Sequence, residues 1–488
     1  MTKAIMIQGT GSNVGKSMIV AGLIRACVKR GINARPFKPQ NMSNNAAVTP
    51  QNGEIGRAQA LQARAAGVAP HTDMNPVLLK PQSDTGAQII VHGKVHDIGD
   101  TSYFRNNKQE LLDKVIESFN VLKSEADIIV VEGAGSPAEV NLRENDIANM
   151  GFAVATNTPV ILIGDIDRGG VIASIVGTHE LLSYEDSQLI KGFIINKFRG
   201  DISLFDDALK VITARTSWKN IGILPFISEV RKLPAEDAVI LDSVKPTTPN
   251  TIIIAVPMLS RIANFDDMDP LIAEPDVELR FIPPGNIIPA NADLVIIPGT
   301  KATLADLAFF RKQGWDIDLA SHVRRGGKVL GICGGYQMLG KTVSDLDGVE
   351  GNIKTADGLG YLSVDTIMMP QKTVCQTTAY SEHLKCETTG YEIHMGDTKG
   401  KDTSRPFLSV KGRALGAATS DHNIVGVYLH GLFADDNFRV KYLSDLCCVT
   451  INRSKYSLQV EKALDTLAEE MENNLDIDAI VNIARKNS

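Results

Sequence analysis

The chain has 488 residues, a formal net charge of −7 at pH 7, and 43% hydrophobic and 22% charged residues. This composition is typical of a globular protein with roughly two to four domains, and the acidic balance argues against a general nucleic-acid binder. No apolar run is long enough to span a membrane, and the N-terminus lacks the pattern of a signal peptide. The six cysteines show no CxxC spacing and do not suggest a disulfide framework. These features predict a reduced, cytoplasmic protein.

Short apolar strands alternate with helical stretches in the first half of the chain. We expect strands at residues 4–8, 34–38, 127–131, 159–164, 192–196 and 221–224. The helices expected between them are 16–29, 55–66, 108–122, 146–155 and 170–182. This βαβ rhythm is typical of a parallel sheet with helices on both faces. The pattern predicts an α/β domain over residues 1–235.

A second unit is expected after a linker at residues 236–250, whose end is rich in proline and threonine. Its expected strands are 251–256, 293–297, 328–332 and 425–429, and its expected helices are 302–310 and 335–340. Residues 460–486 have the pattern of an acidic, amphipathic helix. We therefore predict a second α/β domain at 251–445 and a helical extension at 446–488. The pattern gives no assignment for residues 344–376.

A glycine-rich loop joins the first expected strand to the first expected helix. The N–H groups of such a loop bind phosphate oxygens, its lysine reaches the β- and γ-phosphates, and its serine hydroxyl contacts Mg²⁺. The strict pattern has glycine where this chain has Thr10, so the loop is a variant. A strand–helix turn that binds nothing is the alternative. The residues that we expect to bind ATP are Thr10, Gly11, Ser12, Asn13, Val14, Gly15, Lys16 and Ser17.

Polar residues follow several expected strands, at the edge where open α/β sheets bind ligands. Glu132 ends one strand and Asp165 ends the next. Together with Ser17 they are the candidate ligands of Mg²⁺, because this ion prefers oxygen ligands. Acids that cap a turn or a helix are the alternative. Asn196 ends a further strand and is expected to border the nucleotide.

Three cations are candidate partners for the carboxylates of a substrate. Lys38 ends a strand that is followed by a run of amide side chains, and Lys80 lies in a similar local sequence. Arg57 lies in the second expected helix. A turn explains the prolines and asparagines of these segments equally well, so the assignment rests on charge.

Cys333 lies in a Gly-Ile-Cys-Gly-Gly sequence between an expected strand and an expected helix. This is the pattern of a nucleophile elbow with cysteine in place of serine. The N-terminus of a helix stabilises a thiolate, and the N–H of Gly334 is placed to donate to an oxyanion. The loop that contains Gly299 follows the preceding strand and offers the second donor of the oxyanion hole. A buried structural cysteine is the alternative.

A thiolate nucleophile needs a base, and the chain contains nine histidines. His430 ends an expected strand next to a glycine and is the first candidate. His394, in the sequence Gly-Tyr-Glu-Ile-His-Met-Gly, is the competitor. Cys333 and His430 together predict acyl-transfer chemistry in the second domain.

The C-terminal half resembles the class I, triad-type glutamine amidotransferases in its cysteine elbow and histidine. The N-terminal half resembles the P-loop fold of dethiobiotin synthetase, with which it shares the phosphate loop and the sequence Val-Glu-Gly-Ala-Gly at 131–135. Over its whole length the chain is similar to the cobyric acid synthase family of cobalamin biosynthesis. The segments that carry this resemblance are 8–10, 38–45, 56–63, 165–170, 196–201, 261–270 and 390–396. It implies a P-loop parallel-sheet domain followed by a flavodoxin-like amidotransferase domain.

The resemblance also implies an activity. It is the ATP- and glutamine-dependent amidation of four carboxylate side chains (b, d, e and g) of adenosylcobyrinic acid a,c-diamide, which gives adenosylcobyric acid. ATP and Mg²⁺ would activate each carboxylate as an acyl phosphate. Cys333 would form a thioester with glutamine and release the ammonia that displaces the phosphate. The implied partners are a corrinoid and glutamine, and a homo-oligomer is compatible with the sequence.

One departure from the triad amidotransferases concerns the group that orients the histidine. These enzymes usually carry glutamate two residues after it, where this chain has Leu432. The sequence therefore leaves the orienting group of His430 open. Two other functions also stay open. One is a cobyrinic acid a,c-diamide synthase, and the other is a P-loop switch ATPase with an inactive glutaminase-like domain, although the lysine that such ATPases carry early in the loop is absent.

Overall fold

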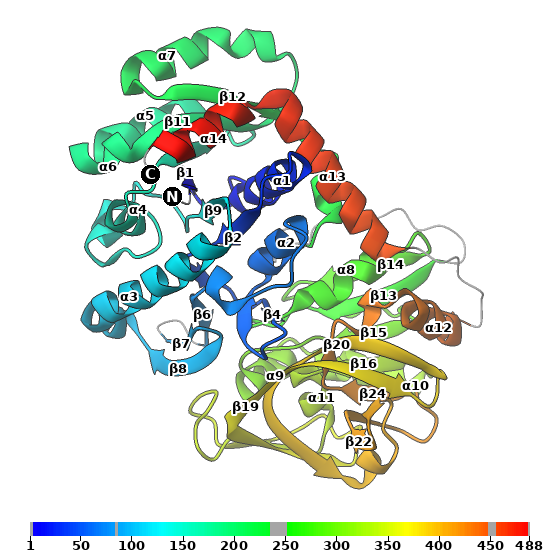
Figure 1. The fold of residues 1–488 in the computed structure, drawn as a ribbon. Helices are drawn as coiled ribbons and strands as arrows, with labels where there is room; N and C mark the ends of the chain where they lie inside the picture. Colours follow the sequence, from blue (N-terminus) through cyan, green and yellow to red (C-terminus); the bar gives the residue numbers. More distant parts are fainter. Residues whose placement is uncertain (1–2, 83–85, 235–250, 448–454, 487–488) are drawn as a thin grey trace.

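The computed structural model describes residues 3–82, 86–234, 251–447 and 455–486. Figure 1 shows two α/β units side by side, the first in blue to green and the second in green to orange. The linker expected at 236–250 lies outside the described residues. Within the described part, no helix is both long enough and apolar enough to cross a membrane.

A six-stranded parallel sheet forms the centre of the first unit, in the order β12-β11-β10-β1-β9-β2. Its central strands are apolar and buried along most of their length, as strands covered on both faces must be. Because all the strands run the same way, the ends of β1, β9, β10 and β11 meet at one edge. The strands are β1 (Lys3–Gly9), β2 (Ala34–Phe37), β9 (Ile128–Glu132), β10 (Val160–Asp165), β11 (Ile190–Phe198) and β12 (Lys219–Pro225).

The helices expected in the first unit are all present, and the parallel α/β prediction is confirmed. The longest extends beyond the expected 108–122 at both ends and begins after Asp100, whose carboxylate accepts the N–H groups of Ser102 and Tyr103. The helices are α1 (Lys16–Lys29), α2 (Arg57–Ala65), α3 (Thr101–Glu125), α4 (Met150–Thr156), α5 (Val171–Leu181), α6 (Tyr184–Leu189) and α7 (Asp206–Thr216).

Two small sheets that the sequence pattern did not predict lie between the units. One has the order β3-β6-β7-β8, with β3 (Gln40–Met42), β6 (Val77–Pro81), β7 (Ala87–Val91) and β8 (Lys94–Gly99). The other pairs β4 (Ala46–Val48) with β5 (Glu54–Gly56). Their apolar side chains share a small core with two residues of the second unit. This cluster contains Ala46, Val48, Leu78, Ile90, Tyr391 and Ile393.

The second unit is built on another six-stranded sheet, in the order β14-β13-β15-β16-β24-β23, in which only β23 is antiparallel. The strands are β13 (Ile252–Pro257), β14 (Val277–Ile282), β15 (Leu294–Ile297), β16 (Lys328–Ile332), β23 (Gly416–Ala418) and β24 (Ile424–Val427). The helices are α8 (Asp269–Ile272), α9 (Thr303–Lys312), α10 (Trp315–Arg324), α11 (Gly334–Leu339) and α12 (Asp436–Cys447).

A long antiparallel hairpin covers one side of the second unit and occupies part of the segment that the sequence left unassigned. Its strands are β19 (Val364–Ser381) and β20 (Cys386–Gly400). The shorter strands around it are β17 (Thr342–Ser344), β18 (Thr355–Asp357), β21 (Ser409–Val410), β22 (Arg413–Ala414) and β25 (Leu429–His430). Short 3-10 helices in the connections are η1 (Thr72–Met74), η2 (Val140–Asn145), η3 (Ile202–Phe205), η4 (Ser228–Lys232), η6 (Phe265–Met268), η7 (Lys401–Ser404) and η8 (Leu432–Ala434).

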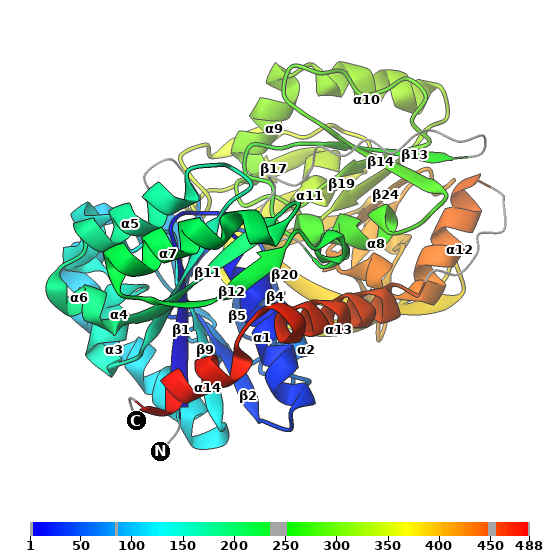
Figure 2. The same cartoon turned by 90° about the horizontal axis from the view of Figure 1, so that it is seen from above.

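The last two helices return to the first unit. Figures 1 and 2 show α13 (Tyr456–Asn474) and α14 (Ile477–Lys486), in red, beside α1 and β1. The apolar face of α13 joins the core around α1, and Arg25 on α1 pairs with Glu461 and Asp465 at 2.9 Å each. The expected C-terminal extension is therefore two helices that pack on the first unit.

Candidate active sites

The phosphate loop is anchored by the lysine that follows it. Lys16 Nζ donates to the carbonyl oxygens of Gly11 at 2.9 Å and Gly135 at 2.8 Å. Gly15 has φ of 100°, and a Cβ there would lie 2.4 Å from Asn196 Nδ2, so only glycine fits. Asn196 Nδ2 also donates to the carbonyl oxygen of Val14 at 2.8 Å. Asn196 at the end of β11 therefore supports the loop from the side.

Most of the predicted ATP-binding residues border one large cleft. They are Ser12, Asn13, Gly15, Lys16, Ser17 and Asn196. Thr10, Gly11 and Val14 are not among the residues that line it. The N–H of Thr10 donates to the carbonyl oxygen of Ile163, and the Val14 side chain belongs to the hydrophobic core.

Glu132 is the centre of a buried polar cluster behind the loop. One of its oxygens accepts from Ser17 Oγ at 2.7 Å and from Lys38 Nζ at 2.8 Å. The other accepts from Gln62 Nε2 at 2.5 Å. Two of the three predicted Mg²⁺ ligands thus lie together, and their oxygens are the donors that this ion prefers. Gln62 is not among the residues predicted from the sequence, although it lies in the 56–63 segment of the family resemblance.

Asp165, the third predicted ligand, is engaged elsewhere at the same edge of the sheet. Its carboxylate pairs with Lys197 Nζ at 2.7 Å and accepts the N–H of Asp167 at 2.9 Å. Lys197 Nζ also donates to the carbonyl oxygen of Asn13 at 2.7 Å. Within the described residues no group of three or more His, Cys, Asp or Glu side chains is placed to hold a metal ion.

The cleft beside the phosphate loop has a volume of about 1920 Å³ and walls from both units. This exceeds the roughly 300–1,000 Å³ of most small-molecule sites, so it has room for a nucleotide and a second, bulky ligand. Apolar residues of the second unit and of the C-terminal helices form one side, including Phe265, Leu279, Phe281, Tyr456 and Met471.

Cys333 occupies a strained turn between β16 and α11. Its φ of 52° and ψ of −106° are unusual for a residue with a side chain, and strain of this kind marks a nucleophile elbow. A Cβ on Gly335 would lie 2.0 Å from the carbonyl oxygen of Ile297, so the turn requires glycine there. The Cys333 sulfur is 3.4 Å from the carbonyl oxygen of Ile393.

His430 pairs with an aspartate that the sequence analysis did not identify. Its Nδ1 lies 2.7 Å from Asp267 Oδ2, and Asp267 Oδ1 accepts the N–H of Gly431 at 2.6 Å. Burial lowers the pKa of His430, but the charge and hydrogen bond of Asp267 and the neighbouring Cys333 raise it to about 10. Asp267 lies on η6, within the 261–270 segment of the resemblance, and it stands where a triad has its third member.

His394, the competing base, also borders the pocket, but its ring faces other partners. Its Nδ1 is 3.0 Å from the carbonyl oxygen of Gly396 and its Nε2 is 3.4 Å from Glu392. The ring stacks on Tyr428 with a centroid separation of 3.8 Å. These contacts favour His430 as the partner of the cysteine.

Of the two glycines predicted for the oxyanion hole, Gly334 lies against the loop that contains Gly299, and Gly299 lies against His430. A Cβ on Gly334 would lie 3.2 Å from the backbone nitrogen of Thr300, so the loop after β15 touches the cysteine elbow. A Cβ on Gly299 would lie 2.9 Å from His430 Cε1. Because Gly334 is the first residue of α11, its N–H has no acceptor within the helix.

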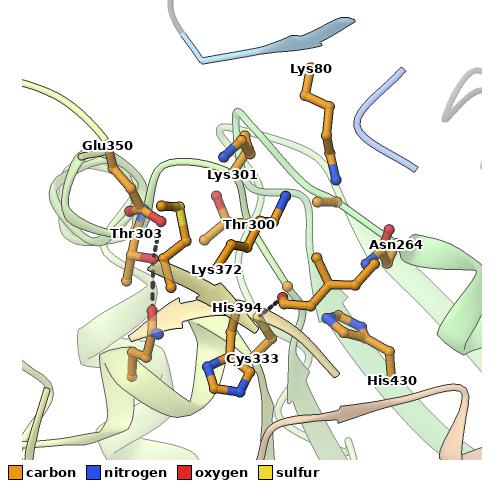
Figure 3. A pocket seen from close by; sticks show the side chains of 15 residues that line it. Lys80, Asn264, Thr300, Lys301, Thr303, Cys333, Glu350, Lys372, His394 and His430 are labelled. Atoms are coloured by element: carbon orange, nitrogen blue, oxygen red, sulfur yellow. Dashed lines mark hydrogen bonds between the residues drawn. The ribbon is translucent and has the colours of Figure 1, made fainter. Parts of the chain in front are cut away.

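The pocket at Cys333 contains side chains from both units, as Figure 3 shows. Lys80 reaches it from β6 and pairs with Glu54 at 2.9 Å. Arg57 pairs with Asp266 of the second unit at 2.9 Å and lines neither cavity. Of the three candidate partners for substrate carboxylates, the structure therefore places only Lys38 in the large cleft.

Comparisons with known proteins agree with this two-site arrangement. A model of the CobQ/CobB/MinD/ParA nucleotide binding domain matches residues 5–240, and one of the CobB/CobQ-like glutamine amidotransferase domain matches residues 253–438. The cobyric acid synthase of Rhodobacter capsulatus is 56% identical over 99% of this chain and 100% of its own length. Those of Mesorhizobium japonicum and Bradyrhizobium diazoefficiens are 53% and 55% identical with the same coverage. The chain therefore belongs to the cobyric acid synthase family of glutamine amidotransferases.

Proposed function

We propose that the protein amidates the b, d, e and g carboxylate side chains of adenosylcobyrinic acid a,c-diamide to give adenosylcobyric acid, using ATP and glutamine. The observation that carries this proposal is the pairing of a phosphate-loop cleft with a Cys–His–Asp site in one chain. The volume of the cleft suits a corrinoid beside a nucleotide.

The nucleotide-binding half activates the carboxylate. Lys16 and the N-terminus of α1 hold the phosphates of ATP, and a substrate carboxylate oxygen attacks the γ-phosphorus. The products of this step are an acyl phosphate and ADP. Ser17 and Glu132 would hold Mg²⁺, which offsets the negative charge of the phosphates. Lys38 helps to hold the Glu132 side chain in place, because Lys38 Nζ and the Ser17 hydroxyl donate to the same carboxylate oxygen of Glu132.

The second half releases ammonia from glutamine. The Cys333 thiolate attacks the carboxamide carbon, and N–H groups at Gly334 and the 299–300 loop stabilise the oxyanion. His430 gives a proton to the leaving nitrogen, and Asp267 keeps its imidazole oriented. Ammonia leaves a thioester, which water hydrolyses to glutamate and the free thiol.

Ammonia then attacks the acyl phosphate carbon, which forms the amide and releases phosphate. The two cavities are lined by neighbouring residues of the same segments, so the path of ammonia between them is short. On β6, Leu79 and Pro81 line the cleft whereas Lys80 lines the cysteine pocket. Similarly, Arg261 and Phe265 line the cleft, whereas residues 263–264 line the pocket.

The proposal includes the compartment of the enzyme. ATP with Mg²⁺ and unpaired thiols suit a cytoplasmic protein, and four cysteines in the described part of the chain are free thiols: Cys27, Cys333, Cys375 and Cys386.

Mass spectrometry of the corrinoid products tests the proposed function. With ATP and glutamine, the a,c-diamide should gain four amides. Addition of two amides to cobyrinic acid, with no reaction of the a,c-diamide, would instead identify an a,c-diamide synthase. A protein that hydrolyses ATP but releases no glutamate under any condition would be a switch ATPase.

A further inference from the structure

Three lysines gather in the pocket beyond Cys333. Lys301 comes from the loop after β15, Lys372 from the β19 strand and Lys80 from β6 of the nucleotide-binding unit. Figure 3 shows their ammonium ends at the opposite side of the pocket from Cys333 and His430. The side chains of Lys80 and Lys372 are 3% and 7% exposed, and Lys301 is 7% exposed overall.

The charges of this cluster do not balance. Glu54 pairs with Lys80 at 2.9 Å and with Lys372 at 2.5 Å. The ammonium group of Lys301 has no hydrogen-bond or ion-pair partner among the residues that the structure describes. Burial and the nearby Lys80 lower the pKa of Lys301, and the charges of Glu350 and Glu54 offset only part of this effect. A buried cation without a partner costs free energy, which an anionic ligand at this position would offset.

A carboxylate faces the same pocket from another wall. Glu350 accepts the N–H of Thr303 at 2.6 Å, and burial raises the pKa of Glu350 to about 7. Beyond the cysteine, the pocket therefore presents cations and one acid. Glutamine has the complementary arrangement, because the end remote from its carboxamide carries an α-carboxylate and an α-ammonium group.

We infer that Lys301, with Lys80 and Lys372 beside it, binds the α-carboxylate of glutamine, and that Glu350 binds its α-ammonium group. This inference rests on the proposed glutaminase function of Cys333. It assigns part of the glutamine site to the nucleotide-binding unit, because Lys80 belongs to β6.

The size of the pocket links glutamine binding to the other unit. Its volume is about 40 Å³, room for a few water molecules, so glutamine bound there would press on the side chains around it. One wall is β6, whose Leu79 and Pro81 line the nucleotide cleft. Ligands in the cleft and glutamine in the pocket thus act on opposite faces of one strand.

The test compares the hydrolysis of glutamine and glutaminamide, in which a neutral amide replaces the α-carboxylate, by the full-length protein. Lys301→Met should raise KM for glutamine and lower kcat/KM by roughly 10- to 100-fold, the effect of one lost charge-assisted hydrogen bond. The slower hydrolysis of glutaminamide should change by less than about threefold, since the group that Lys301 contacts is absent. Lys301→Arg should restore part of the preference for glutamine.

Lys80→Met should show the same selective loss, which measures the contribution of the nucleotide-binding unit. Lys399→Met is the matched control, because this lysine is exposed on β20, its ion pair is with Asp397, and it is not among the residues that line the pocket. Equal losses on both substrates, or no loss with Lys301→Met, would overturn the inference. If Lys301→Met does not fold, Lys372→Gln gives the same comparison. No corrinoid enters this assay, so a failure of the corrinoid proposal would leave the result intact.

Discussion

Asp267 Oδ2 lies 2.7 Å from His430 Nδ1, and both side chains are only 1% exposed. The aspartate also accepts the N–H of Gly431, so it fixes both the ring and the backbone that carries it. Water does not compete for a contact this deeply buried, which strengthens the pairing. The chain thus orients its histidine with an acid from a distant segment instead of the glutamate two residues later that triad amidotransferases use.

Asp267→Asn should lower the glutaminase kcat by roughly 10²- to 10⁴-fold, because an amide can present its N–H to Nδ1 and favour the wrong tautomer. Ammonia release from glutamine is the measurement. Asp397→Asn is the control, since this aspartate is half exposed on β20. Activity of Asp267→Asn close to that of the parent protein would remove Asp267 from the site.

Cys333→Ala should abolish glutamine-dependent amidation and retain amidation driven by ammonium salts. The variant loses the nucleophile, whereas the phosphate loop and the large cleft do not involve the sulfur. Product analysis with each nitrogen source checks this. A variant that ammonia cannot rescue would show that the two halves do not divide the work in this way.

Lys16→Ala should lose amidation with either nitrogen source, because acyl phosphate formation precedes both. The variant also loses two hydrogen bonds that hold the loop to Gly11 and Gly135. ATP binding by calorimetry and product formation with ammonia are the measurements, and Lys210→Ala on the exposed face of α7 is the control. Full turnover with ammonia would reject the phosphate-loop role.

Much of the fold could be predicted because the buried parallel strands are short apolar runs between helices. Strands such as β9 and β10 are buried along their whole length, and no polar residue interrupts the pattern before the functional end. Among the strands between the units, β3, β4 and β5 were missed because they have three residues each, too few for a period to show.

The site residues also fall into those that the sequence predicts and those that it does not. The phosphate loop and Cys333 lie on strand-to-helix turns with local sequence patterns, so one stretch of sequence predicts each. Asp267 is 163 residues from His430 and has no local pattern that links the two. Lys80 could be recognised as a cation, but only the three-dimensional structure places it in the pocket of Cys333 and not in the cleft beside the phosphate loop. Long-range pairing of this kind is set by tertiary packing.

The stability of the protein should fall as the pH rises from about 7 towards 10. The pKa of His430 is raised from 6.5 to about 10 in the folded chain, mainly because Asp267 offsets the cost of burial. Because protonated His430 is favoured in the folded chain, its contribution to the free energy of unfolding is complete below pH 6.5, the unfolded pKa. This contribution is lost as the pH rises through the folded pKa of about 10. Urea unfolding midpoints across this range should show the fall in the parent protein and a smaller one in Asp267→Asn. The same slope in both would exclude this pair as the cause.

Leu464→Ala should destabilise the nucleotide-binding unit by roughly 2–5 kcal/mol, the usual range for a cavity at a fully buried leucine. Leu464 is 0% exposed on the face of α13 that packs on α1. Leu458 on the same helix is 57% exposed, so Leu458→Ala should change stability by less than about 0.5 kcal/mol. Thermal unfolding of the two variants gives the comparison. Because α1 begins at Lys16, a loosened α13 should also weaken ATP binding, and an unchanged affinity in a destabilised Leu464→Ala protein would show that α13 supports the fold but not the phosphate loop.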